Sequence, residues 1–207
     1  MKTLILTILL PFTFLSQVID YNNFDSKRAE VVLFETLQHF RDTIQYTGGG
    51  KLQKECYSGV KDYKTSMKWV WSDDVYKLFS KPNCEKIVKE NRLYHNDVKD
   101  FFKSEKCQQL FIPIVWKNYK GNYPFTPHVA YSENGVMSTV EYKTYQEMAN
   151  DMIKIWESSI MHKGTQRRFF SDEIVKLFGK DLYTQVACCV RYSNGSFWAF
   201  VNIVYAT

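Results

Sequence analysis

The sequence lacks the short motifs that mark dedicated metal sites and several classes of hydrolase. It contains no Cys-x-x-Cys pair and no His-x-x-x-His repeat, which are common spacings of zinc ligands. It also contains neither the Gly-x-Ser-x-Gly turn of the α/β-hydrolases nor the His-Glu-x-x-His helix of metalloproteases. These absences favour a binding protein over an enzyme.

The sequence also lacks a membrane-length apolar run, internal repeats and clusters of like-charged residues. Beyond Leu15 no apolar run reaches the roughly 20 residues that a membrane-spanning helix needs, so we expect no transmembrane anchor. The chain has 27 Lys and Arg against 22 Asp and Glu, a formal net charge of +5, and its lysines are scattered among acidic residues. This distribution argues against a nucleic-acid partner.

Residues 1–17 have the pattern of a secretory signal peptide. Lys2 supplies the charged start, and the apolar core runs from Leu4 to Leu15, which is too short to cross a bilayer. The polar stretch Asp20–Asn23 follows, and we expect cleavage within residues 16–20. The protein is therefore predicted to be secreted, with residues 24–207 forming a single domain.

Five cysteines follow the predicted signal peptide: Cys56, Cys84, Cys107, Cys188 and Cys189. Cysteines of exported proteins usually pair, so all five are disulfide candidates. Their odd number leaves one thiol over, which could join two chains, and about 15 patterns of two bridges are possible. If Cys188 and Cys189 lie in a strand, their side chains leave opposite faces of the sheet.

Apolar spacing and capping residues predict helices in the first three quarters of the chain. One helix is expected over 25–45, another from Val75 to the stop at Pro82, and a third over 84–103 with Asn83 as its cap. Thr144-Tyr145-Gln146-Glu147 forms a capping box before a further helix.

Strands are expected towards the C-terminus. Residues 129–132 form a short candidate strand, and two longer candidates, 182–192 and 197–205, flank Asn194-Gly195. This dipeptide between strand-like runs is a strong signal for a β-hairpin. Helices followed by a closing hairpin predict an α+β fold with a C-terminal antiparallel β-hairpin. Asn194 is also the acceptor of an Asn-Gly-Ser glycosylation sequon at the exposed tip.

Two motifs and their order resemble a known family. Ser132-Glu133-Asn134-Gly135 precedes a helix that ends in Trp156-x-x-Ser159-x-x-His162, and the hairpin comes last. This order resembles the CAP superfamily, which includes the SCP-like cysteine-rich secretory, antigen 5 and pathogenesis-related proteins. The resemblance implies a secreted domain with an α-β-α sandwich fold, and residues 130–205 carry it best.

The resemblance also implies a surface cleft lined by two histidines and two acidic residues, which can hold a divalent metal. Glu133 and His162 match two of these positions, and His95 and His128 are candidates for the remaining histidine. Ser159 stands where many members have an acid, so we expect at most weak binding of Zn²⁺ or another divalent metal. If the resemblance is set aside, the residues have simpler interpretations: Glu133 is a carboxylate at a strand end, and His162 is a residue at a helix terminus.

Three functions remain open from the sequence. The favoured one is a non-catalytic extracellular binding or signalling module whose partner is an extracellular protein or a lipid or sterol. The second is a secreted hydrolase that uses Glu133 and His162 as acid and base. The third is an extracellular structural protein in which the odd cysteine makes a disulfide-linked dimer.

Overall fold

The computed structural model describes residues 17–43, 68–93, 129–159, 162, 165–166 and 183–206, and these residues form an α+β fold. The sheet has four strands in the order β1-β3-β4-β2, with β1 parallel to β3 and the other neighbours antiparallel. The strands are β1 (Lys68–Trp71), β2 (Val129–Ser138), β3 (Tyr183–Ser193) and β4 (Ser196–Ala206). β2 is therefore longer than the strand predicted over 129–132.

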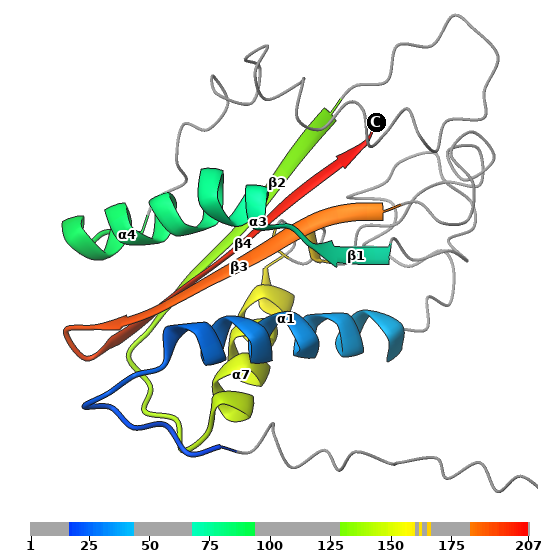
Figure 1. Ribbon diagram of the computed structural model, residues 1–207. Coiled ribbons are helices and arrows are strands. Elements are labelled where there is room, and N and C mark those ends of the chain that lie inside the picture. The colour runs from blue at the N-terminus through cyan, green and yellow to red at the C-terminus, as the bar shows by residue number, and fades with distance from the viewer. Residues whose placement is uncertain are drawn as a thin grey trace, which may run out of the picture.

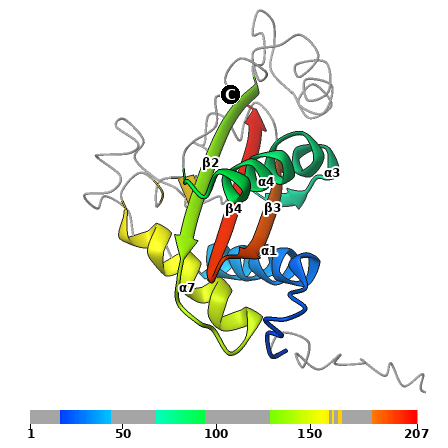
Figure 2. The ribbon, with the colours of Figure 1, turned by 90° about the vertical axis from the view of Figure 1, so that its left-hand side faces the viewer.

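The two longest helices pack on one face of the sheet. α1 (Ser26–Thr43) contacts both β3 and α7 (Tyr145–Ser158), and Figures 1 and 2 show both helices on the same side of the strands. The fully buried stripe of α1 consists of Ala29, Val32, Leu33 and Leu37. The predicted capping box of α7 is confirmed at its first half, because the Thr144 side chain accepts a hydrogen bond from the Glu147 amide at 3.1 Å.

A helical run covers the opposite face, and its boundaries differ from those predicted from the sequence. α3 (Asp73–Val75), the wide turn η2 (Tyr76–Ser80) and α4 (Lys81–Glu90) follow one another without a break, so Pro82 does not end a helix. Pro82 lies in the first turn of α4, directly after the wide turn η2. Ser72 caps the run by accepting a hydrogen bond from the Val75 amide at 3.3 Å.

The predicted helix over 84–103 is wrong at both ends. α4 begins earlier, so Asn83 lies inside the helix with a buried side chain instead of capping it. α4 ends at Glu90 because Asn91 adopts a left-handed backbone conformation (φ 49°), which asparagine tolerates better than most residues. The Asn91 amide then donates to the Val88 carbonyl at 3.3 Å, as in many helix C-termini.

β3 and β4 are joined by a two-residue turn that sets their register. Asn194 (φ 52°) and Gly195 (φ 72°) are both left-handed, as the type I′ turn requires. Cys188 pairs with Val201 and Cys189 with Phe200. One face of the sheet therefore carries Cys188 towards α1 and α7, and the other face carries Cys189 towards α4.

Candidate functional site

Glu133 lies in the middle of β2 on the face covered by α4. In the register it stands beside Asn202 of β4, whose Nδ2 atom donates to Glu133 Oε2 at 2.9 Å. Asn83 Nδ2 of α4 donates to the same oxygen at 3.0 Å, and the Tyr131 hydroxyl donates to it as well. One oxygen of the Glu133 carboxylate thus receives three hydrogen bonds, from side chains of α4, β2 and β4.

The neighbouring phenol is held in its neutral form. Burial raises the pKa of Tyr131, and the negative charge of Glu133 raises it further. Tyr131 therefore serves Glu133 as a hydrogen-bond donor. The carboxylate acts here as the acceptor that holds α4 onto β2 and β4, since Asn202 is fully buried and Asn83 is 3% exposed.

The Glu133 carboxylate and the His162 carbonyl oxygen lie at opposite faces of the sheet. Asn134, the next residue of β2, points to the other face, where its Nδ2 atom donates to the His162 carbonyl oxygen at 2.9 Å. The His162 backbone is thus on the face covered by α1 and α7, whereas the Glu133 carboxylate is on the face covered by α4. His95 and His128 lie outside the described residues.

Among the described residues, no group of three or more His, Cys, Asp or Glu side chains could hold a metal ion. Ser159 is the C-cap of α7 and is partly buried. Of the residues expected at the cleft, the structure thus describes the surroundings of the Glu133 carboxylate, which lies within a cluster of amide and phenol donors.

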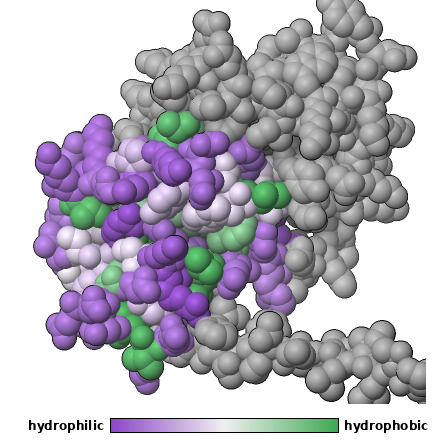
Figure 3. Space-filling view, viewed as in Figure 1, coloured by the Kyte–Doolittle hydropathy of each residue, from purple (hydrophilic) through white to green (hydrophobic). Residues whose placement is uncertain are grey.

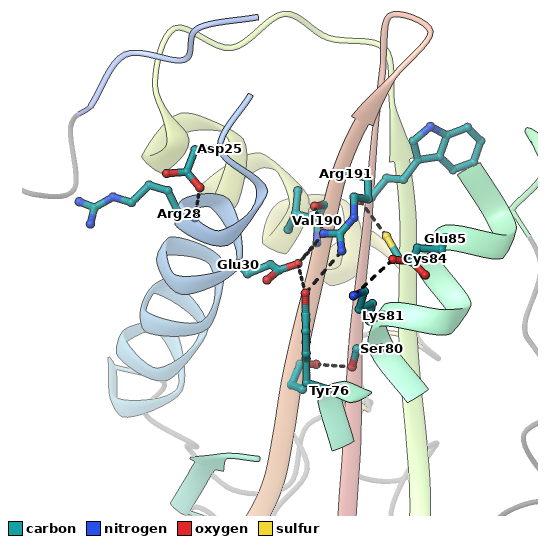
Figure 4. A network of polar contacts seen from close by, with 12 residues as sticks. Asp25, Arg28, Glu30, Tyr76, Ser80, Lys81, Cys84, Glu85, Val190 and Arg191 are labelled. Carbon is teal, nitrogen blue, oxygen red and sulfur yellow. Dashed lines mark hydrogen bonds and ion pairs between the residues drawn. The ribbon is translucent and has the colours of Figure 1, made fainter. Parts of the chain in front are cut away.

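A second polar cluster lies at the edge of β3. β1 pairs with residues 183–186, and no other described strand adjoins β3 on that side from Ala187 onwards. Glu30 of α1 occupies this edge: its Oε1 atom accepts from the Val190 amide at 3.4 Å and from Arg191 Nη1 at 2.6 Å. The Tyr76 hydroxyl donates to the same carboxylate oxygen at 3.1 Å, as Figure 4 shows.

This cluster forms the floor of a cavity of about 710 Å³ between α1, β1 and η2. Its walls are largely aromatic: the Phe34 and Trp71 rings lie edge to face with centroids 5.5 Å apart, and Trp71 lies 5.7 Å from Tyr76. Val31 of α1 also lines the cavity and is 38% exposed. The cavity thus combines an apolar wall with one ion pair.

Charge in the cavity is slightly negative. Three acidic residues line it, Glu30, Glu35 and Asp73, against the two basic residues Lys27 and Arg191. Burial raises the pKa of Tyr76, and Glu30 raises it further against the opposing hydrogen bond from Arg191. Tyr76 is therefore a neutral phenol at physiological pH and acts as a hydrogen-bond donor to Glu30.

The sequence did not predict this cavity. Its floor comes from residues 46, 115 and 161 positions apart in the chain, which no local pattern connects. One signal was present, because Arg191 lies in an apolar strand and a charge in such a place needs a partner. Glu30 lies beside the apolar stripe of α1 and would have been the matching acid.

In Figure 3 the apolar side chains of the coloured residues are scattered among hydrophilic ones, with no large apolar patch among these described residues on that face. None of the described helices is both long enough and apolar enough to cross a membrane.

The chain gives no match in comparisons with protein-family models, curated proteins or solved structures.

Proposed function

We propose that the protein is a secreted, non-catalytic binding module that holds a neutral, sterol-like lipid in the cavity between α1, β1 and η2. The carrying observation is the cavity itself, because about 710 Å³ lies within the roughly 300–1,000 Å³ common for small-molecule sites. Rigid aromatic walls, such as those of Phe34 and Trp71, suit a flat ring system.

The charges of the cavity favour a neutral ligand over a fatty acid. Arg191, the basic residue of the floor, is already paired with Glu30 at 2.6 Å. The lining acids outnumber the lining bases by three to two, so a ligand carboxylate would meet net repulsion. A hydroxyl group, in contrast, could exchange hydrogen bonds with the Glu30 and Tyr76 oxygens.

The geometry at Glu133 supports a role without catalysis or metal. Three donors already occupy one of its carboxylate oxygens, and the His162 backbone lies at the other face of the sheet. Cys84, Cys188 and Cys189 are fully buried, so none of these three is placed to join a second chain. Cys56 and Cys107 lie outside the described residues.

We also propose that the protein is exported and that it has a CAP-type α-β-α sandwich fold with a closing hairpin. Val18 forms an isolated β-bridge with Thr144, and the Ile19 amide donates to the Lys143 carbonyl at 3.0 Å. Cleavage of the signal peptide before Val18 would keep both contacts. Asn194 is exposed, so a glycan on it would meet no packed neighbour. Sequencing the N-terminus of material secreted from cultured eukaryotic cells, with and without glycosidase treatment, tests these points.

Ligand binding is tested by titrating a fluorescent sterol and a fluorescent fatty acid into the mature protein. We expect saturable sterol binding and at least about tenfold weaker binding in Val31→Asp, which places a charge in the apolar wall. Val140→Asp is the matched control, since Val140 is 53% exposed and lies outside the cavity lining. No saturable sterol signal, or equal binding by Val31→Asp and wild type, would overturn the proposal, and saturable fatty-acid binding would redirect it to an anionic lipid.

A further inference from the structure

We propose that Cys84 and Cys189 form a disulfide bond that ties α4 to β3. Both residues are fully buried, and they belong to the same small apolar cluster beneath α4. In the structure no bond joins the two sulfurs. The inference concerns the attachment of α4 to the sheet and does not rest on the ligand proposed above.

Two contacts fix the face of the helix that carries Cys84. Ser80 Oγ donates to the Ala187 carbonyl of β3 at 3.2 Å, and Cys84 Sγ donates to the Trp198 carbonyl of β4 at 3.8 Å, as Figure 4 illustrates. Ser80 and Cys84 are four residues apart, so they lie on the same side of the helix. That side faces the strands at the level of Cys189, two positions after Ala187.

The strand geometry selects Cys189 over its neighbour. Adjacent strand residues point to opposite faces, and Cys188 packs in the core formed with α1 and α7. Cys189 packs with Cys84, Ile87, Trp198 and Phe200 on the face of α4. A bridge from Cys84 to Cys188 would have to pass through the sheet, so the structure reduces the choices for Cys84 among the described cysteines to one.

The bond must form before α4 is fully packed. Burial raises the pKa of the Cys189 thiol, and the adjacent Cys84 raises it further, so the folded thiol is protonated and a poor nucleophile. During folding, one cysteine thiolate attacks a disulfide such as glutathione disulfide and releases one glutathione thiolate. The second cysteine then attacks the mixed disulfide and releases the other. The two cysteines are oxidised, and the glutathione disulfide is reduced to two glutathione molecules that take up the two protons.

The test uses the purified full chain, unfolded under reducing conditions and refolded in glutathione and glutathione disulfide. Recovery of native structure is followed by circular dichroism, and free thiols are then alkylated in denaturant before digestion and mass spectrometry. We expect a crosslinked peptide pair that contains Cys84 and Cys189 and is lighter than the two reduced peptides by two hydrogen atoms. This readout does not depend on export, so failure of the secretion proposal would not be mistaken for failure of the bridge.

Variants provide a reciprocal signature. In Cys84→Ala, Cys189 should become labelled by the alkylating reagent, and in Cys189→Ala, Cys84 should become labelled. Cys188→Ala is the matched control and should keep the crosslink. Folded wild-type protein in which Cys84 and Cys189 both carry label, or in which Cys84 is linked to another cysteine, would overturn the proposal whether or not the variants fold.

Discussion

Arg191 and Glu30 form an ion pair with Nη1 and Oε1 2.6 Å apart, although they approach β3 from different sides. Arg191 lies on the α4 face of the strand, and its guanidinium reaches around the strand edge to the carboxylate of α1 (Figure 4). The side chains are 21% and 5% exposed, so the pair is largely shielded from water. Glu30 therefore pairs with a partly buried cation and accepts from the Val190 amide.

Replacing this carboxylate should destabilise the protein. Glu30→Gln removes the negative charge opposite Arg191, and we expect a loss of about 2 kcal/mol in the free energy of unfolding, somewhat less than for a fully buried pair. Urea denaturation at neutral pH measures the change. Glu35→Gln is the matched control, because Glu35 is exposed on the same helix and should lose less than about 0.5 kcal/mol. Equal stability of the two variants would contradict the role assigned to Glu30.

Glu133 should matter for stability more than a surface acid does. Glu133→Ala leaves the amides of Asn83 and Asn202 without their acceptor, at a cost of about 2–3 kcal/mol. Glu141→Ala, which removes an exposed carboxylate eight residues later, should change stability by less than about 0.5 kcal/mol. Denaturant titration of both variants decides the point, and a neutral effect of Glu133→Ala would mean that water replaces the carboxylate at this site.

Gly135 should tolerate no side chain. A Cβ atom there would lie 2.6 Å from Phe200 Cε1 and 2.8 Å from Cζ, and Phe200 is 1% exposed and has little room to move. We expect Gly135→Ala to lower the free energy of unfolding by about 1–3 kcal/mol through overpacking.

The comparison variant is Gly195→Ala in the β3–β4 turn. Its Cβ atom would meet open space, so its cost should be only the strain of a left-handed alanine, about 1 kcal/mol. Thermal unfolding of both variants separates packing from backbone strain. A smaller loss in Gly135→Ala than in Gly195→Ala would show that the Phe200 ring can move aside.

Alkaline pH should weaken the fold at Tyr142. Burial raises the pKa of this phenol to about 12, from 10.0 for an ordinary tyrosine, and its hydroxyl lies 2.7 Å from both Ser138 Oγ and Asp151 Oδ2. A raised pKa means that the folded state holds the proton more tightly than the unfolded state. The contribution to stability is therefore complete below pH 10 and is lost as the pH rises from about 10 to about 12.

Urea denaturation across this pH range, with tyrosinate absorbance as a second signal, measures the loss. Tyr142→Phe cannot ionise at this position, so its stability should fall less steeply and approach that of the wild type at the alkaline end. Parallel curves for the two proteins would show that Tyr142 does not contribute to the alkaline transition.

Local features of the fold followed from local sequence. The stripe of α1 repeats at helical spacing, the Thr144 cap begins α7 where expected, and Asn194-Gly195 supplies the two left-handed residues that a two-residue turn needs. Each of these depends on interactions within a few residues, and chain order alone contains that information.

The prediction from local sequence that a helix ends at Pro82 was wrong. A proline is compatible both with the end of a helix and with its first turn. The packing of η2 and α4 against β3 decides between them, with Ser80 bonded to Ala187, a residue 107 positions away. A local rule has no access to a contact at that separation.

The sequence by itself determined where α1, α7 and the last two strands lie, and that adjacent Cys188 and Cys189 must face opposite ways if they are in a strand. Only the tertiary structure decided that Cys84 lies against Cys189, that Glu30 reaches Arg191, and that Glu133 and the His162 backbone lie at different faces. The physical reason is that these pairs depend on which strands are neighbours and in which register. Strand order and register are set by packing the whole core.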